Sequence, residues 1–482
     1  MRRRPLQIFP LFVALALAAS ACATEASFGT ASIDVAGDAL DQSGDLDSEI
    51  DGPIAPATGL GRGDAPTSDQ VVKAALYDVS SFWQRTYEGL YGTPFQPISG
   101  GFWPYGPQTV QPPCGQPAPT YGDIAHNAFY CPGADLIAWD EATLIPELYD
   151  EFGGFTLGIV FAHEFGHAIQ TRAGATRSPT VVLEPQADCF AGAWARDVEA
   201  GNSEYFELTT EDLDKALAGF LALRDSVGVS AEHPAAHGTG FDRIGSFVEG
   251  YEGGVEQCAG YPEAAAAGDL VVVELPFERQ DDFEREGNLP LDQLGPILVE
   301  DLESFWNDLF EAEGEDWIPI TGVEPIDPAA DEVDCDTHLG GDLSRSFYCV
   351  DDNTIYVDEV NLIPALNDVG DYAVATEIAR LYAVAAQARL GSDESTVATN
   401  LTADCLTGVY ASSRFDPDRQ DEGRALVLSP GDLDEAVIAF LLDSAATEDG
   451  DVSAGTPFQR FGAYRDGFLS GLPACNALVE DA

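Results

Sequence analysis

The chain has 482 residues, enough for more than one domain of ordinary size, and 45% of them are hydrophobic, as in a globular protein. It carries 83 acidic against 22 basic residues, which gives a formal net charge of −61 at pH 7. Such a surface repels phosphates and argues against nucleic acid as a partner; we interpret the charge as a means of staying soluble rather than as an acidic binding function.

The first 22 residues have the pattern of an export signal. Three arginines, Arg2 to Arg4, precede an apolar stretch that ends in ASAC at Cys22. The stretch is too short to favour a membrane span. It resembles a bacterial lipoprotein signal, which implies a lipid on Cys22 and a cell-surface protein that meets the membrane only through this anchor. The alternative is ordinary cleavage and release as a secreted protein.

The rest of the chain contains one pattern twice. FYCPGADLIAWDEATLIPEL at 129–148 matches FYCVDDNTIYVDEVNLIPAL at 347–366, and ADCFAG from Ala187 matches ADCLTG from Ala403. A domain copied in tandem accounts for these matches. The stretch before the first copy is rich in Ala, Gly, Ser and Asp and cannot bury enough apolar surface to fold. The expected parts are a signal at 1–22, a disordered acidic tether at 23–68, copy one at 69–262, a linker at 263–292 and copy two at 293–482.

The cysteines follow the same duplication. Apart from Cys22 there are eight, in two sets of four with similar spacing. An exported chain favours disulfides, and pairing first with second and third with fourth within each set is the simplest hypothesis, although sequence does not fix connectivity. The two sets are Cys114, Cys131, Cys189 and Cys258, and Cys335, Cys349, Cys405 and Cys475.

The apolar patterns predict an α+β fold. Helices are expected over 156–173, 183–200 and 211–225, where apolar residues recur at helical spacing. Short strands are expected over 134–140, ADLIAWD, and over 353–359, NTIYVDE.

The helix at 156–173 carries the sequence AHEFGH. His163 and His167 stand at i and i+4, so both imidazoles leave the same helix face and can share one zinc ion. Glu164 beside them is the expected general base. The alternative is two ordinary histidines on an amphipathic helix.

The next helix carries LEPQADC, in which Glu184 and Asp188 are also four residues apart. A catalytic zinc commonly has three protein ligands and an open position for water, so Glu184 is the expected third ligand. Asp188 can accept the second ring N–H of a ligand histidine and fix its orientation. The alternative is a solvated acidic helix face.

These motifs, with Gln170, Trp194 and HGTGFDR from His237, resemble the bacterial neutral zinc metallopeptidases over nearly all of copy one. The resemblance implies a zincin-like fold, a zinc cofactor, and an extended peptide that pairs with the edge of the strand at 134–140. Pro185 departs from the family pattern and would make the helix begin near it, in which case His237 or Asp188 would replace Glu184 as ligand. His237 is otherwise a candidate donor to the oxyanion, or an ordinary loop histidine.

Copy two lacks these groups. Arg380, Leu381 and Val384 stand where copy one has His163, Glu164 and His167, and Asn400 stands in place of Glu184. We therefore expect copy two to be metal-free and catalytically inactive.

The sequence thus predicts an exported zinc metallopeptidase that acts on peptides or proteins through Glu164 and a zinc-activated water. Two alternatives stay open, namely a proteolytically idle surface lipoprotein that acts in binding or adhesion, and a zinc hydrolase of some other amide. No pattern in the sequence indicates the oligomeric state.

Overall fold

The structure is a computed structural model. It describes residues 66–175, 178–225, 237–268, 270, 272–273, 283–285, 287–341, 343, 345–392, 394–415, 426–445 and 454–480. The expected signal, Cys22, most of the tether and much of the linker lie outside these residues. In the part of the chain that is described, no helix is long and apolar enough to cross a membrane.

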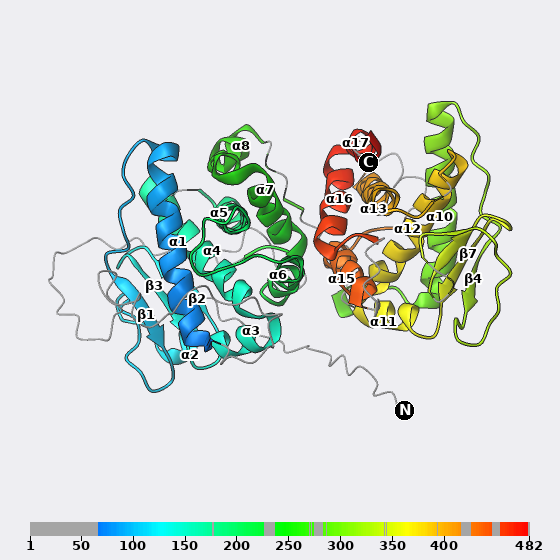
Figure 1. The fold of residues 1–482 in the computed structure, drawn as a ribbon. Coiled ribbons are helices and arrows are strands. Elements are labelled where there is room, and N and C mark those ends of the chain that lie inside the picture. Colours follow the sequence, from blue (N-terminus) through cyan, green and yellow to red (C-terminus); the bar gives the residue numbers. More distant parts are fainter. Residues whose placement is uncertain are drawn as a thin grey trace.

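The first half of the described chain is an α+β unit (Figure 1), as the sequence patterns predict. Its small sheet has the strand order β1-β3-β2, with β3 parallel to β1 and antiparallel to β2. The elements are α1 (Ser68–Tyr91), β1 (Gly101–Tyr105), α2 (Tyr121–Ile124), β2 (Ala128–Cys131), β3 (Leu136–Asp140), α3 (Leu144–Phe152), α4 (Gly154–Ala173), α5 (Thr180–Glu199), α6 (Thr210–Ala222), α7 (Gly240–Ala259) and α8 (Tyr261–Ala267).

The second half repeats this arrangement. Its sheet has the order β4-β7-β6-β5, in which β7 is again parallel to one neighbour, β4, and antiparallel to the other, β6. The elements are α10 (Leu291–Glu313), β4 (Gly322–Ile326), β5 (His338–Leu339), β6 (Phe347–Cys349), β7 (Thr354–Asp358), α11 (Leu362–Val369), α12 (Asp371–Arg389), α13 (Val397–Ser412), η2 (Ser413–Phe415), α15 (Asp432–Ala445), α16 (Pro457–Ser470) and α17 (Leu472–Glu480).

Three details differ from the sequence-based expectations. The strand at 134–140 forms β3, which pairs on both sides, so its edges are not open to a substrate; the edge strands are β1 and β2. Helix α5 begins at Thr180 rather than near Pro185, which lies inside the helix. Helix α8 runs past the expected boundary at residue 262, and α10 begins just before the expected end of the linker.

Each half contains two disulfides, four in all. The sulfur atoms lie 2.05 to 2.15 Å apart in all four pairs. One bridge in each half links two helices of the helical part that follows the sheet, α5 with α7 and α13 with α17. The pairs are Cys114–Cys131, Cys189–Cys258, Cys335–Cys349 and Cys405–Cys475.

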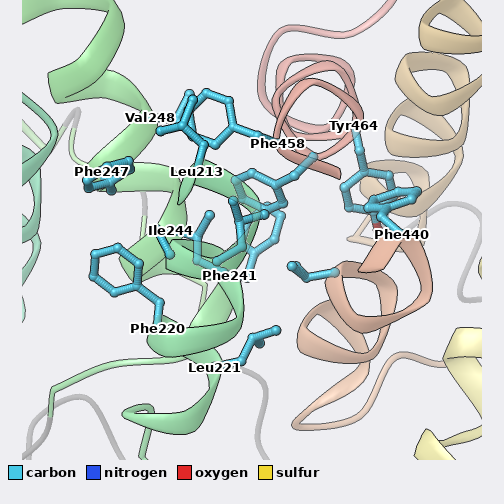
Figure 2. Packing of buried hydrophobic residues seen from close by; sticks show 14 of the residues in the cluster. Leu213, Phe220, Leu221, Phe241, Ile244, Phe247, Val248, Phe440, Phe458 and Tyr464 are labelled. Atoms are coloured by element: carbon cyan, nitrogen blue, oxygen red, sulfur yellow. The ribbon is translucent and has the colours of Figure 1, made fainter. Parts of the chain in front are cut away.

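The two halves meet through helices α6 and α7 of the first and α15 and α16 of the second (Figure 1). The contact is aromatic and pseudo-symmetric. Phe241 at the start of α7 lies 6.3 Å from Tyr464 between ring centroids, and Phe458 at the start of α16 lies 6.3 Å from Phe247. Figure 2 shows these side chains in the region between the two sets of helices. The core of each half therefore continues into the core of the other.

Candidate metal centre

The two histidines of the AHEFGH motif lie on α4, a helix buried along most of its length. Glycine brings the next helix close to it, because a Cβ atom at Gly166 would lie only 2.8 Å from the Cα atom of Ala187 on α5. This close approach places Glu184, one turn before Ala187, beside the face of α4 that carries the histidines.

Three side chains converge at this point. The Nε2 atoms of His163 and His167 lie 3.1 Å apart. The carboxylate of Glu184 lies 3.3 Å from Nε2 of His163 and 3.5 Å from Nε2 of His167. One ligand atom from each residue lies within 4.8 Å of the other two, so the group could hold a metal ion.

The chemistry of the group fits zinc. Two imidazole nitrogens and one carboxylate oxygen are a common ligand set for a catalytic zinc with an open fourth position. Oε2 of Glu184 is buried and has no hydrogen-bond partner. A shared cation would satisfy this oxygen and would also explain why two ring nitrogens face each other at such short range.

A second pair of residues orients His163 from behind. Its Nδ1 atom lies 2.7 Å from Oδ1 of Asp188, which is fully buried. Burial alone would lower the pKa of His163, but the charge of Asp188 opposes it and the pKa rises to about 10. Arg243 in turn donates two hydrogen bonds to Asp188, at 2.9 and 3.0 Å. Burial raises the pKa of Asp188, but the charge of Arg243 outweighs it and keeps this pKa low.

His167 is oriented by a different route. Its Nδ1 atom lies 3.0 Å from Oε1 of Gln170, whose amide donates to the carbonyl oxygen of Leu183 at 2.6 Å. Both histidines therefore have their Nδ1 atoms engaged, which leaves Nε2 of each directed at Glu184. Because Leu183 immediately precedes Glu184, the same contact also ties the third candidate ligand to the helix of the first two. Pro185 does not displace Glu184 from this position.

Glu164 lies beside the group and is 94% buried. Its Oε2 atom accepts a hydrogen bond of 2.7 Å from the backbone N–H of Tyr130 on β2. Burial is the largest effect on this carboxyl and raises its pKa. A carboxyl with a raised pKa that is held by a fixed donor is suited to accept a proton and return it.

A pocket of about 70 Å³ opens next to Glu164 and His163. Leu144, Leu148 and Phe220 contribute to its apolar lining. His237 also lines it, with its side chain 30% exposed and its backbone N–H bonded to Asp225 at 2.7 Å. The pocket can therefore take one apolar side chain beside the metal group.

Two contributors to the site have no clear signal in the sequence. His126 lines the pocket but belongs to no recognisable motif. The N–H of Tyr130 is a backbone group, which a residue pattern cannot reveal. Arg243 could have been found, because Arg460 stands at the matching position of copy two and makes the same contact, with Asp404, at 2.9 Å.

The matching place in the second half holds an ion pair. Arg380, which corresponds to His163, donates two hydrogen bonds of 3.0 Å to Glu377. Leu381 and Val384 replace Glu164 and His167, and all of these side chains are buried. The described residues of the second half contain no group of two histidines and a carboxylate.

The chain is similar to bacterial proteins whose names state no function. "Uncharacterized protein YpfJ" of Escherichia coli K12 is 31% identical over 157 residues, which cover 28% of this chain and 53% of that protein. "Uncharacterized protein Rv2575" of Mycobacterium tuberculosis is 30% identical over 152 residues, which cover 26% of this chain and 52% of that protein. The chain thus spans about half the length of these curated relatives. No solved structure gives a significant match.

The family match covers the half of the chain that contains the metal group. The three candidate metal ligands, His163, His167 and Glu184, all lie within the matched range. Over residues 62–261, the chain matches the family described as "Putative neutral zinc metallopeptidase".

Proposed function

We propose that the first half of the chain is a zinc-dependent peptidase and that the second half is catalytically inactive. The observation that carries the proposal is the convergence of His163, His167 and Glu184 beside the buried carboxyl of Glu164. The ion pair of Arg380 and Glu377 supports the second part, because it occupies the matching place with no metal-binding group.

A zinc ion in this group would supply a Lewis acid and lower the pKa of a water molecule to about 7. Glu164 takes a proton from the attacking water and returns it to the leaving amine. The N–H of Tyr130 holds one oxygen of this carboxylate, which leaves the other for the proton. His237 lines the same pocket, which supports a role as donor to the developing oxyanion.

The substrate is proposed to be an extended peptide lying along β2. This strand is at the edge of the described sheet, and the N–H of Tyr130 points away from β3 to Glu164. A peptide that adds to this edge would pass the metal group, with one apolar side chain in the pocket.

We also propose export of the protein and a lipid anchor at Cys22, on the basis of the arginines and the apolar stretch that precede it. Export agrees with the four disulfides, which persist in oxidising compartments.

The test is cleavage of casein and of a broad peptide library by the zinc-loaded protein. Glu164→Gln should lower the rate at least about 100-fold while zinc content stays unchanged, because the variant loses only the proton acceptor. Glu151→Gln is the matched control, since Glu151 is exposed at the end of α3. If Glu164→Gln cleaves as fast as this control, the mechanism is wrong. Zinc binding without any cleavage by the unaltered protein would favour a non-proteolytic role.

A further inference from the structure

Three carboxyl groups of the second half meet where two helices begin. Asp371 is the first residue of α12, and Asp432 and Glu435 lie in the first turn of α15. They are 7%, 3% and 7% exposed, in that order. One oxygen of each lies within 4.8 Å of the other two.

Helix capping explains part of this cluster. Asp432 accepts hydrogen bonds from the N–H and the hydroxyl of Ser429, at 2.8 and 2.6 Å. Glu435 accepts one from the N–H of Tyr372 at 2.9 Å, at the start of α12. Capping would need no third carboxyl in the same place.

Asp371, in the first turn of α12, is only partly explained by capping. Its Oδ2 atom accepts from the N–H of Leu289 at 2.9 Å. Its Oδ1 atom is buried and has no hydrogen-bond partner. A buried carboxylate oxygen without a partner is costly, and it indicates that a ligand completes the site.

The matching positions of the first half do not carry the three carboxyl groups. The glycine before α4 and the glycine before α12 are equivalent, so Asp371 corresponds to Gly154. DLDKALAGF from Asp212 matches DLDEAVIAF from Asp432, so Glu435 corresponds to Lys215. Copy one therefore has one carboxylate and one ammonium group where copy two has three carboxylates.

Three negative charges at this range repel one another strongly. Burial, followed by the charge of Asp371, raises the pKa of Glu435 to about 8. Burial and the charge of Glu435 raise the pKa of Asp432 well above its usual value. Arg285 acts on Asp371 from the segment before α10, but its side chain is exposed. Tyr372, Asp434 and Tyr464 are the other titratable groups that act on the cluster or feel its charge.

We propose that Asp371, Asp432 and Glu435 form a binding site for a divalent cation of the calcium class. All three donors are carboxylates, which suit a hard cation that takes six to eight oxygens, whereas zinc prefers nitrogen and sulfur. Neutral oxygens are also close: Oδ1 of Asn288 accepts from the N–H of Asp371 at 2.7 Å, and the Ser429 hydroxyl bonds Asp432.

The position of the site gives it a structural role. The cation joins α12, α15 and the residues just before α10, which reach the cluster through Asn288 and Leu289. Asp434, between Asp432 and Glu435, forms an ion pair of 3.0 Å with Arg224 of the first half. Cation binding therefore stabilises the second half at the helix that contacts the first.

The test uses the full-length, zinc-loaded protein at pH 8, with calcium titrated by calorimetry and thermal unfolding followed in parallel. We expect one site with a Kd on the order of 10⁻⁴ M and a rise in Tm of about 3 °C at 1 mM free calcium. Glu435→Gln and Asp371→Asn should each weaken binding at least ten-fold. Glu359→Gln, which removes an exposed acid of the same half, should leave binding unchanged.

A second probe separates a cation from shared protons. Terbium, a luminescent substitute for calcium, should be sensitised by Tyr372, which adjoins Asp371, and Glu435→Gln should abolish this signal while Glu359→Gln preserves it. If the carboxyls only share protons, Glu435→Gln will raise Tm at pH 8 and calcium will act equally on all variants. That result would overturn the proposal, as would the absence of any calcium response in the unaltered protein.

Discussion

Asp214 on α6 and Asp434 on α15 occupy matching positions in the two halves, and each caps a helix of the other half. Oδ1 of Asp434 accepts the backbone N–H of Phe241 at 2.8 Å, and Oδ1 of Asp214 accepts that of Phe458 at 3.1 Å. Both phenylalanines stand two residues after the threonine that begins their helix. The two copies are thus related by a pseudo-two-fold axis, as in a homodimer.

Loss of Asp434 and loss of Asp214 should affect zinc binding differently, although the two contacts are equivalent. The N–H bonded by Asp434 begins α7, and Arg243 of α7 holds Asp188 behind His163. Asp434→Ala should therefore weaken zinc binding as well as lower the free energy of unfolding, by about 1–3 kcal/mol for the unsatisfied N–H. Asp214→Ala frees the matching N–H in the second half, away from the metal group, and should affect stability alone. Zinc affinity and urea unfolding of both variants test this, and equal zinc affinities would refute it.

Asp214 also predicts a pH dependence. Burial raises its pKa from the usual 3.8 to about 6. The folded state therefore binds this proton more tightly than the unfolded state does, so the free energy of unfolding falls as pH rises from about 4 to 6. Asp214→Asn keeps an acceptor for Phe458 but cannot titrate, and should lose this part of the slope. Urea unfolding at intervals between pH 4 and 8 measures it; identical slopes would contradict the prediction.

The third candidate ligand can be tested with the residue that copy two provides. Glu184→Asn introduces the side chain found at the matching position, Asn400. Zinc content and activity should fall together, because a neutral amide is a poor ligand for zinc. The zinc content of Glu184→Asn can be measured by metal analysis after dialysis. Glu164→Gln, which should keep its zinc, is the control. Full zinc occupancy in Glu184→Asn would remove Glu184 from the ligand set.

Asp188→Asn should give an intermediate result. The change keeps the shape of the side chain but removes the charge that orients His163 and pairs with Arg243. Zinc affinity should weaken about 10- to 100-fold, as is usual for the loss of a carboxylate behind a ligand histidine. Competition with a zinc chelator measures the affinity. A value equal to that of the unaltered protein would mean that Asp188 only supports the fold.

Much of the fold is present in local patterns. The helix at 156–173 and the strand at 353–359 follow from apolar spacing, and the structure has α4 and β7 there. The fold is α+β, as predicted. Local patterns do not determine the order of strands within a sheet. The family resemblance implies an edge strand at 134–140, whereas the structure has β3 there, between β1 and β2. The start of α5 was misplaced because the preference of Pro185 was overridden by packing against α4.

The site shows the same limit. His163 and His167 meet because one helix carries both, which spacing reveals. Glu184 joins them through the packing of α4 on α5, for which the sequence gives only a chemical argument. The acidic cluster of copy two could not be predicted from the sequence, since Asp371 and Asp432 are far apart in the chain and neither lies in a motif with metal-ligand spacing.

Asp214 bonds Phe458 of the second half, and Phe241 bonds Asp434 of the second half. Both members of the contact are present in the first copy alone, so its α6–α7 surface is complementary to itself. Residues 69–262 alone, should they fold, would expose Phe241 and pair at sufficient concentration with a second molecule of the same kind. Fusion of the copies replaces that bimolecular step by an intramolecular one, with an effective concentration in the millimolar range. The half with the metal group then keeps its partner at any dilution, and the partner does not need a metal group of its own.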